Sequence, residues 1–205
     1  MTVPGRSAAP RWRAERARTR VDAGLTLVEL MVATALGLLT MAAFTALLTT
    51  LLAARARAAE SADTMLAAAG ALDQIVRDVR LAGYDPAGRG IVAISGASAT
   101  TVVLAADLDG SGDVDPASEE QITYRTAGGG DTLQRVVGQQ SLPLLSDLAP
   151  DGLRFGYLDL DGVELDPRAP GASAAVRAVT IELGLRATAT HAALRLRGAG
   201  RLLNR

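Results

Sequence analysis

The chain is 205 residues long, which is enough for one hydrophobic core of ordinary size with an appended segment. Its formal net charge of −1 argues against general nucleic-acid binding, and the absence of cysteine excludes a disulfide framework and a thiolate metal site. The chain has one histidine, His191, and no set of histidine, nucleophile and acid can be assembled from its motifs. We therefore expect no enzymatic activity and no certain cofactor.

The N-terminal residues combine a basic block with a long apolar run. Six arginines lie within the first 20 residues: Arg6, Arg11, Arg13, Arg16, Arg18 and Arg20. Residues 30–54 contain no charged side chain, and about 20 apolar residues suffice for a helix to cross the hydrocarbon core. Because basic flanks stay in the cytoplasm, we expect a single-pass inner-membrane anchor with a periplasmic C-terminal domain. The alternative is a secretory signal peptide, but its apolar core is usually about 7–15 residues.

A single carboxylate, Glu29, lies at the start of this apolar helix, five residues after Gly24. An acid at membrane depth is costly and usually functional, although a helix N-terminus also favours negative charge. The stretch Gly24-Leu25-Thr26-Leu27-Val28-Glu29-Leu30 resembles the class III signal of type IV prepilins, whose pattern is glycine and then usually Phe-Thr-Leu-x-Glu-Leu. Leu25 departs from this pattern, and Ala46 stands where many major pilins carry proline.

The resemblance to prepilins implies a specific processing step. A membrane-bound prepilin peptidase would cut between Gly24 and Leu25 and methylate the new amine of Leu25, so that residues 1–24 are a cytoplasmic leader. The resemblance also implies that Glu29 pairs with the N-terminal amine of an adjacent subunit during assembly. Physically, the amine freed on Leu25 lies in apolar surroundings, where an unpaired charge is unfavourable and a nearby carboxylate relieves it.

The helix is expected to continue beyond the apolar run. No proline occurs between Leu25 and Tyr84. Seven apolar residues then recur at helical spacing: Met65, Leu66, Ala69, Leu72, Ile75, Val76 and Val79. The sequence predicts one helix from Leu25 to about Leu81, in which residues 25–54 lie in the membrane or the filament core. Residues 55–84 are its amphipathic half and need a sheet to cover them.

The end of the helical region is set by Gly83-Tyr84-Asp85-Pro86, because proline cannot continue a helix. Two shorter helices with a joint near Arg55–Ala62 are the alternative to a single long helix. The same end point is expected for both arrangements.

Residues 85–205 change to short β-type segments separated by turn signals such as Gly128-Gly129-Gly130. The predicted strands are Ile91–Ser95, Thr100–Leu104, Gln121–Arg125, Thr132–Val137, Leu153–Leu158, Val176–Arg186 and His191–Arg197. A long helix followed by antiparallel strands predicts an α+β fold, and this is also the pilin-like plan. The segments Arg80–Tyr84, Gln121–Arg125 and Val176–Ile181 resemble PilW-type minor pilins, and the layout is similar to the larger J-type minor pseudopilin of type II secretion.

An acidic loop lies between two of the predicted strands. Its oxygen-bearing side chains alternate: Asp107, Asp109, Ser111, Asp113 and Asp115. Calcium prefers such oxygen ligands, and Gly112 permits the sharp turn that they require. Ser118 stands where an EF-type loop carries its last acidic ligand and Glu119 comes one residue late, while the flanks are strands and not helices. A calcium site that includes Glu119 and a solvated Asp/Gly turn are the two interpretations.

These patterns favour a structural role over a catalytic one. The leading hypothesis is a minor pilin, a priming subunit of a type IV pilus whose partners are other pilin subunits, the prepilin peptidase and the inner membrane. The alternatives are a minor pseudopilin of a type II secretion system, a calcium-dependent adhesive or binding module, and a plain bitopic membrane protein.

Overall fold

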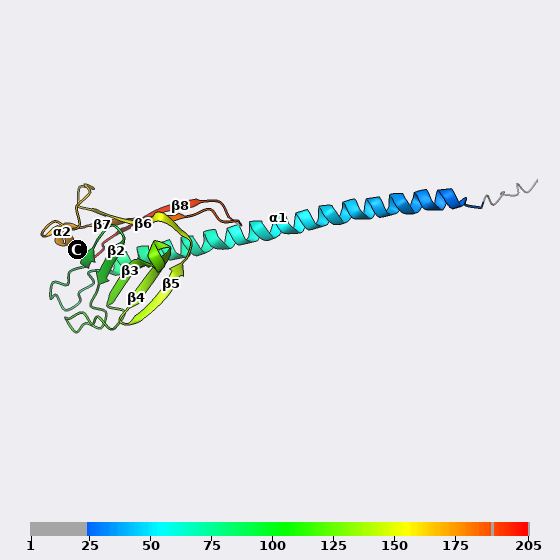
Figure 1. Cartoon of the computed structure of the whole chain (residues 1–205). Helices are drawn as coiled ribbons and strands as arrows, with labels where there is room; N and C mark the ends of the chain where they lie inside the picture. The colour runs from blue at the N-terminus through cyan, green and yellow to red at the C-terminus, as the bar shows by residue number, and fades with distance from the viewer. Residues whose placement is uncertain (1–23, 190, 205) are drawn as a thin grey trace, which may run out of the picture. The chain divides into compact units, whose positions relative to one another are not determined.

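A computed structural model describes residues 24–189 and 191–204. Within them one long helix, α1 (Leu27–Leu81), comes first, followed by strands (Figure 1). The helix is continuous through Arg55–Ala62, so the prediction of a single helix is confirmed and the alternative joint is not present. It ends at Leu81, as the sequence predicts, two residues before Gly83, whose φ of +78° suits glycine. The leader predicted over 1–24 lies outside the described residues, apart from Gly24.

The chain divides into two compact units, residues 1–50 and residues 51–205. In the first unit, every described residue from Gly24 onward is exposed. Among the described residues, α1 is the one helix long and apolar enough to cross a membrane, a judgement that rests on its length and composition alone.

The second unit holds the C-terminal part of α1 and two antiparallel sheets. The first sheet has the order β1-β2-β3-β4-β5, and its strands are β1 (Ile94–Ala97), β2 (Thr101–Ala105), β3 (Gln121–Ala127), β4 (Thr132–Val137) and β5 (Gln140–Leu145). The second has the order β6-β7-β8, and its strands are β6 (Leu148–Leu158), β7 (Ala178–Leu185) and β8 (Leu194–Arg201). The short helices η1 (Gly128–Gly130) and α2 (Ala172–Ala175) connect strands. The α+β fold class is thus confirmed.

The sequence-based strand prediction is right for seven of these strands in position and misses β5. The β4 bounds agree with the prediction residue for residue, whereas β6 begins five residues before the predicted Leu153. The missed strand β5 contains Pro143, which cannot donate to a sheet, and it lies at the edge of its sheet where proline is tolerated.

The buried face of α1 begins later than its apolar pattern suggests. Ala68, Ala71, Ile75 and Val79 are buried against the sheets. Met65, Leu66 and Ala69, which the helical spacing placed on the covered face, are exposed instead. The buried face thus begins with two small residues and continues with two larger ones.

An ion-pair network joins α1 to the first sheet. The Asp78 carboxylate accepts hydrogen bonds from the Tyr124 hydroxyl on β3 (2.6 Å) and from Nε of Arg135 on β4 (3.2 Å). Arg135 also pairs with Glu119, and that hydrogen bond lowers the pKa of the Glu119 carboxyl. Burial, reinforced by Asp78, raises the pKa of the Tyr124 hydroxyl, so Tyr124 remains a donor at neutral pH. The network fixes the rotation of the helix relative to the sheet.

Two glycines bring β8 of the second sheet onto α1. A Cβ at Gly198 would lie 2.9 Å from Leu72 Cδ1, and a Cβ at Gly200 would lie 2.7 Å from Val79 Cγ1. Such distances are shorter than van der Waals contact, so a side chain at either position would push the strand away from the helix.

We expect Gly200→Val to destabilise the second unit by about 1–3 kcal/mol, because the added methyl groups overpack the contact with Val79. The matched control is Ala199→Val on the same strand, whose side chain is exposed and whose change should stay within about 0.5 kcal/mol. Urea unfolding followed by circular dichroism measures both. Equal stability of the two variants would contradict the close approach of β8 to α1.

Candidate functional site

The N-terminal end of α1 carries a reciprocal hydrogen-bonded pair, Thr26 and Glu29. The Thr26 hydroxyl accepts the Glu29 backbone N–H (3.2 Å), and Oε2 of Glu29 accepts both the Thr26 backbone N–H and the Thr26 hydroxyl (3.1 Å each). This geometry is a capping box, which supplies partners for donors that the first helical turn leaves free. The prediction that a helix N-terminus accommodates the acid is confirmed.

The capping box uses only one oxygen of the Glu29 carboxylate. Both hydrogen bonds fall on Oε2, and Oε1 has no partner among the described residues. The carboxylate is therefore oriented by its own helix and still has a free acceptor. It lies within one helical turn of the Gly24–Leu25 bond.

The bond between Gly24 and Leu25 is exposed and precedes the first helical residue. No atom lies within 4 Å of the position that a Cβ on Gly24 would occupy. Within the described part of the chain, nothing in the protein itself covers this junction.

The apolar part of α1 satisfies its own polar groups. Each of its five threonines donates its hydroxyl to a backbone carbonyl one turn earlier: Thr34, Thr40, Thr45, Thr49 and Thr50. Such bonding leaves no hydroxyl that needs water, which is the requirement for a surface in contact with lipid or with other apolar helices.

A second cluster of functional interest is the acidic loop between β2 and β3. The carboxylate oxygens of Asp107, Asp109 and Glu120 lie within 4.8 Å of one another, and Asp107 and Glu120 are buried. Oxygen atoms so arranged are of the type that binds calcium.

The loop backbone already supplies hydrogen bonds to the two buried carboxylates. Asp107 accepts the N–H groups of Gly110 (2.8 Å) and Gly112 (2.9 Å). Glu120 accepts three more, from Leu108 (2.8 Å), Asp109 (3.1 Å) and Asp115 (2.8 Å). Two buried acids thus hold the loop in shape through main-chain donors. The loop is an Asp/Gly turn, as in the second interpretation, but these two carboxylates are buried and not solvated.

The structure brings together only part of the ligand set predicted from the sequence. Asp107 and Asp109 are in the cluster, whereas Asp113 and Asp115 are exposed and lie outside this group of carboxylates; Ser111 is exposed beside Asp109. The exposed carboxyl of Asp109 has a lowered pKa because it accepts a hydrogen bond from the Ser111 backbone.

The predicted ligand set contained Glu119, whereas the cluster in the structure contains Glu120 instead. Glu119 pairs with Arg135 on β4, and its carboxylate is not part of the group formed by Asp107, Asp109 and Glu120. Side chains alternate along a strand, and buried Ile122 and Tyr124 share the parity of Glu120. Extending the alternation of β3 back by two residues would have placed Glu120 inside and Glu119 outside.

The comparisons with known proteins do not add to this picture. A scan against protein-family models and a search of curated proteins each gave no match. The function of both clusters is therefore argued from their residues and geometry.

We expect Asp107→Ala to destabilise the second unit by about 2–4 kcal/mol, because it leaves the N–H groups of Gly110 and Gly112 without an acceptor. Asp107→Asn keeps one acceptor oxygen and should cost less. The control Asp113→Ala removes an exposed carboxylate from the same loop and should stay within about 0.5 kcal/mol. Thermal unfolding in calcium-free buffer measures all three, and a neutral Asp107→Ala would contradict the structural role of this carboxylate.

Proposed function

We propose that the chain is a minor pilin, a structural or priming subunit of a type IV pilus that is processed between Gly24 and Leu25. The observation that carries this proposal is the junction itself: a glycine, an exposed peptide bond and a capped Glu29 at the start of an apolar helix. A peptidase can reach such a bond without unfolding the helix.

The exposed surface of α1 supports an assembly role. All residues from Gly24 to Asp63 are exposed, and they include more than a dozen large apolar side chains. Surface of this kind and extent must be covered by lipid or by other protein chains. In the proposal, the inner membrane covers it before assembly, with the N-terminus in the cytoplasm and the second unit in the periplasm. Neighbouring subunits cover it in the filament.

Glu29 has the geometry for the proposed pairing with a neighbouring subunit. Its Oε2 accepts hydrogen bonds from Thr26, while Oε1, which has no partner in the described part of the chain, would accept the methylated amine of Leu25 from an adjacent chain. Cleavage would create that amine in apolar surroundings, where its charge is stable only when paired. The capping box would therefore present an ordered carboxylate to an incoming subunit.

A minor pseudopilin of a type II secretion system would need the same junction and the same helix. Deletion of the gene separates the two assignments: loss of pili with normal secretion supports the pilus, and loss of secretion with normal pili supports the pseudopilus.

We expect mass spectrometry of the mature protein to give an N-methylated Leu25 as the first residue. Gly24→Leu places a branched side chain in the cleaved position and should leave the leader attached, whereas Gly37→Leu, a matched change further along α1, should be processed normally. A mature chain that keeps Met1, or one that starts at Arg57, would contradict the proposal.

Assembly is tested separately from cleavage by Glu29→Gln. This variant should lose its N-terminal leader normally and fail to enter filaments, because an amide cannot neutralise the amine of a neighbouring Leu25. Glu60→Gln, at an exposed position of the same helix, is the control and should be incorporated normally. Filament incorporation of Glu29→Gln at the wild-type level would remove the proposed role of this residue.

A second candidate is a calcium-dependent binding role of the acidic loop, and the observation that favours it is the grouping of Asp107, Asp109 and Glu120. Calcium at about ten times its Kd should stabilise the full chain in detergent by about 1.4 kcal/mol. Asp109→Ala, which spares the two buried carboxylates, should abolish the shift in melting temperature. No shift at millimolar calcium would contradict this role.

A further inference from the structure

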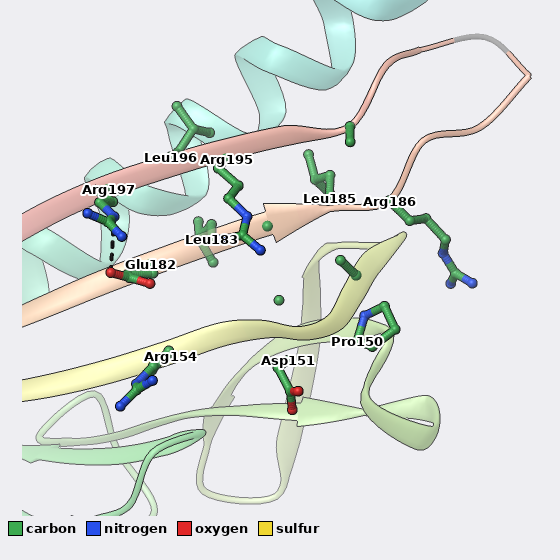
Figure 2. A pocket seen from close by; sticks show the side chains of 14 residues that line it. Pro150, Asp151, Arg154, Glu182, Leu183, Leu185, Arg186, Arg195, Leu196 and Arg197 are labelled. Carbon is green, nitrogen blue, oxygen red and sulfur yellow. Dashed lines mark ion pairs between the residues drawn. The ribbon is translucent and has the colours of Figure 1, made fainter.

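The arginines on the second sheet are offset by carboxylates within the fold. Four of them line a hollow of about 590 Å³ beside a bulge in β6 (Figure 2). Arg197 pairs with Glu182 at 3.0 Å. Arg186 lies 3.6 Å from Asp131 and 3.5 Å from Asp147, and one further aspartate lines the hollow. Four carboxylates thus match four arginines, so the hollow has no excess of positive charge.

Two arginines on α1 differ from these, because no carboxylate pairs with them. Arg55 and Arg57 are exposed, and neither forms an ion pair with a residue that the structure describes. The next acids along the helix, Glu60 and Asp63, are exposed as well and do not pair with them. The sheets begin to bury α1 at Ala68, about 16 Å beyond Arg57 at about 1.5 Å per residue. The positive charge at this point of the helix is therefore not neutralised by the described part of the chain.

The two arginines directly follow the charge-free run of α1. Residues 30–54 contain no charged side chain, and a helix of that length covers about 37 Å at about 1.5 Å per residue. The hydrocarbon core of a bilayer is about 30 Å thick, and the bilayer with its headgroup regions is about 40–45 Å thick. A helix that crosses the bilayer with this run therefore places its first charges beyond it at the level of the headgroup phosphates.

The Arg57 side chain is turned back toward the apolar run. Its Nε donates to the backbone carbonyl of Ala53 at 3.2 Å, one helical turn earlier. The two Nη groups of Arg57 have no partner among the described residues. Because the guanidinium group is a planar fork of donors, its free side matches the oxygens of a phosphate group. An anion at the edge of the apolar layer would meet these free donors.

We infer that Arg55 and Arg57 bind the phosphate groups of phospholipids in the outer leaflet and so fix the depth of the unassembled subunit in the inner membrane. Phosphate is the anion that a bilayer presents at this level, and basic residues beside a membrane helix are attracted to it. The competing occupant is a carboxylate of another subunit, which is present only after assembly. The inference rests on the membrane stage of the proposed function and deepens it by naming the lipid headgroup as a partner.

The chain has no cysteine, so a fluorophore on Ala58→Cys reports the lipids beside the two arginines. Full-length, uncut chains are reconstituted in vesicles of a neutral glycolipid. Spin-labelled phosphatidylglycerol or a spin-labelled glycolipid with the same acyl chains is then added, so that the headgroup phosphate distinguishes the two quenchers. We expect phosphatidylglycerol to quench the fluorophore at about tenfold lower concentration than the glycolipid.

Substitution of the arginines tests the cause of this preference. Arg55→Gln with Arg57→Gln should make the two lipids quench equally, because an amide carries no charge to attract phosphate. Arg55→Lys with Arg57→Lys keeps both charges and should keep most of the preference. The control pair, Arg77→Gln with Arg80→Gln, removes two exposed arginines further along α1 and should leave the preference unchanged. Glutamine and lysine are good helix formers, so all three variants keep α1.

The depth of the helix is the second readout. In the glutamine pair of positions 55 and 57 the charge-free run extends as far as Glu60, so the helix can slide further into the bilayer. Labelling of Ala58→Cys by a membrane-impermeant maleimide should then fall about tenfold, because a cysteine in the hydrocarbon region is not reached from water. The lysine pair should be labelled at the wild-type rate.

Equal quenching by the two lipids in the wild-type chain would overturn the inference. A preference that survives in the glutamine pair, or one that the control pair loses as well, would also overturn it, and unchanged maleimide labelling of the glutamine pair would overturn the role in depth. The uncut chain is used, so these outcomes do not depend on cleavage. A correctly processed Leu25 together with equal quenching would remove the lipid contact and leave the proposed function standing.

Discussion

Among the residues that the structure describes, the long helix α1 exposes an apolar surface that no other segment covers. Removing such a surface from water is the dominant favourable contribution to association as well as to folding. The sheets bury the helix only from Ala68 onward. From Gly24 to Asp63 the side chains are exposed, and the threonines among them bond back to their own helix. The threonine hydroxyls of this part of the helix thus find hydrogen-bond partners within the helix, while its apolar side chains remain exposed. That combination is compatible with contact with lipid and with contact with other apolar helices, and it is one of the observations that support the proposed function.

The same helix is also the organising element of the folded unit, and two different contacts hold it there. On the side of the first sheet, the contact is polar and directional, because Asp78 binds Tyr124 and Arg135. On the side of the second sheet, it is steric, because Gly198 and Gly200 let β8 approach. Polar contacts fix rotation, and close packing fixes distance.

The sequence predicts the elements well where local chemistry decides them. The long helix, its end at Leu81 and the bounds of β4 follow from periodicity, the absence of proline and turn residues. Features that depend on how strands pair in the folded protein could not be predicted from the sequence. Pro143 argues against a strand until one knows that β5 is an edge strand, and the bulge in β6 exists only relative to its partner β7. Met65 and Leu66 fit the helical pattern, yet no sheet reaches them.

The candidate sites likewise divide into features that local sequence decides and features that tertiary contacts decide. The capping box of Thr26 and Glu29 could be read from a spacing of three residues, since both partners lie in one helical turn. The exchange of Glu119 for Glu120 in the acidic loop could not be read from the spacing of an EF-type loop, because strand alternation and Arg135 decide which carboxylate turns inward. Glu29 and Glu120 differ in how their carboxylates are hydrogen-bonded. Both oxygens of Glu120 accept hydrogen bonds, from three backbone donors in all, whereas only Oε2 of Glu29 accepts hydrogen bonds from the described residues. The carboxylate that the fold itself satisfies thus shapes a loop, and the carboxylate with an acceptor left over in the described part of the chain is the one that the proposed function assigns to a contact with another subunit.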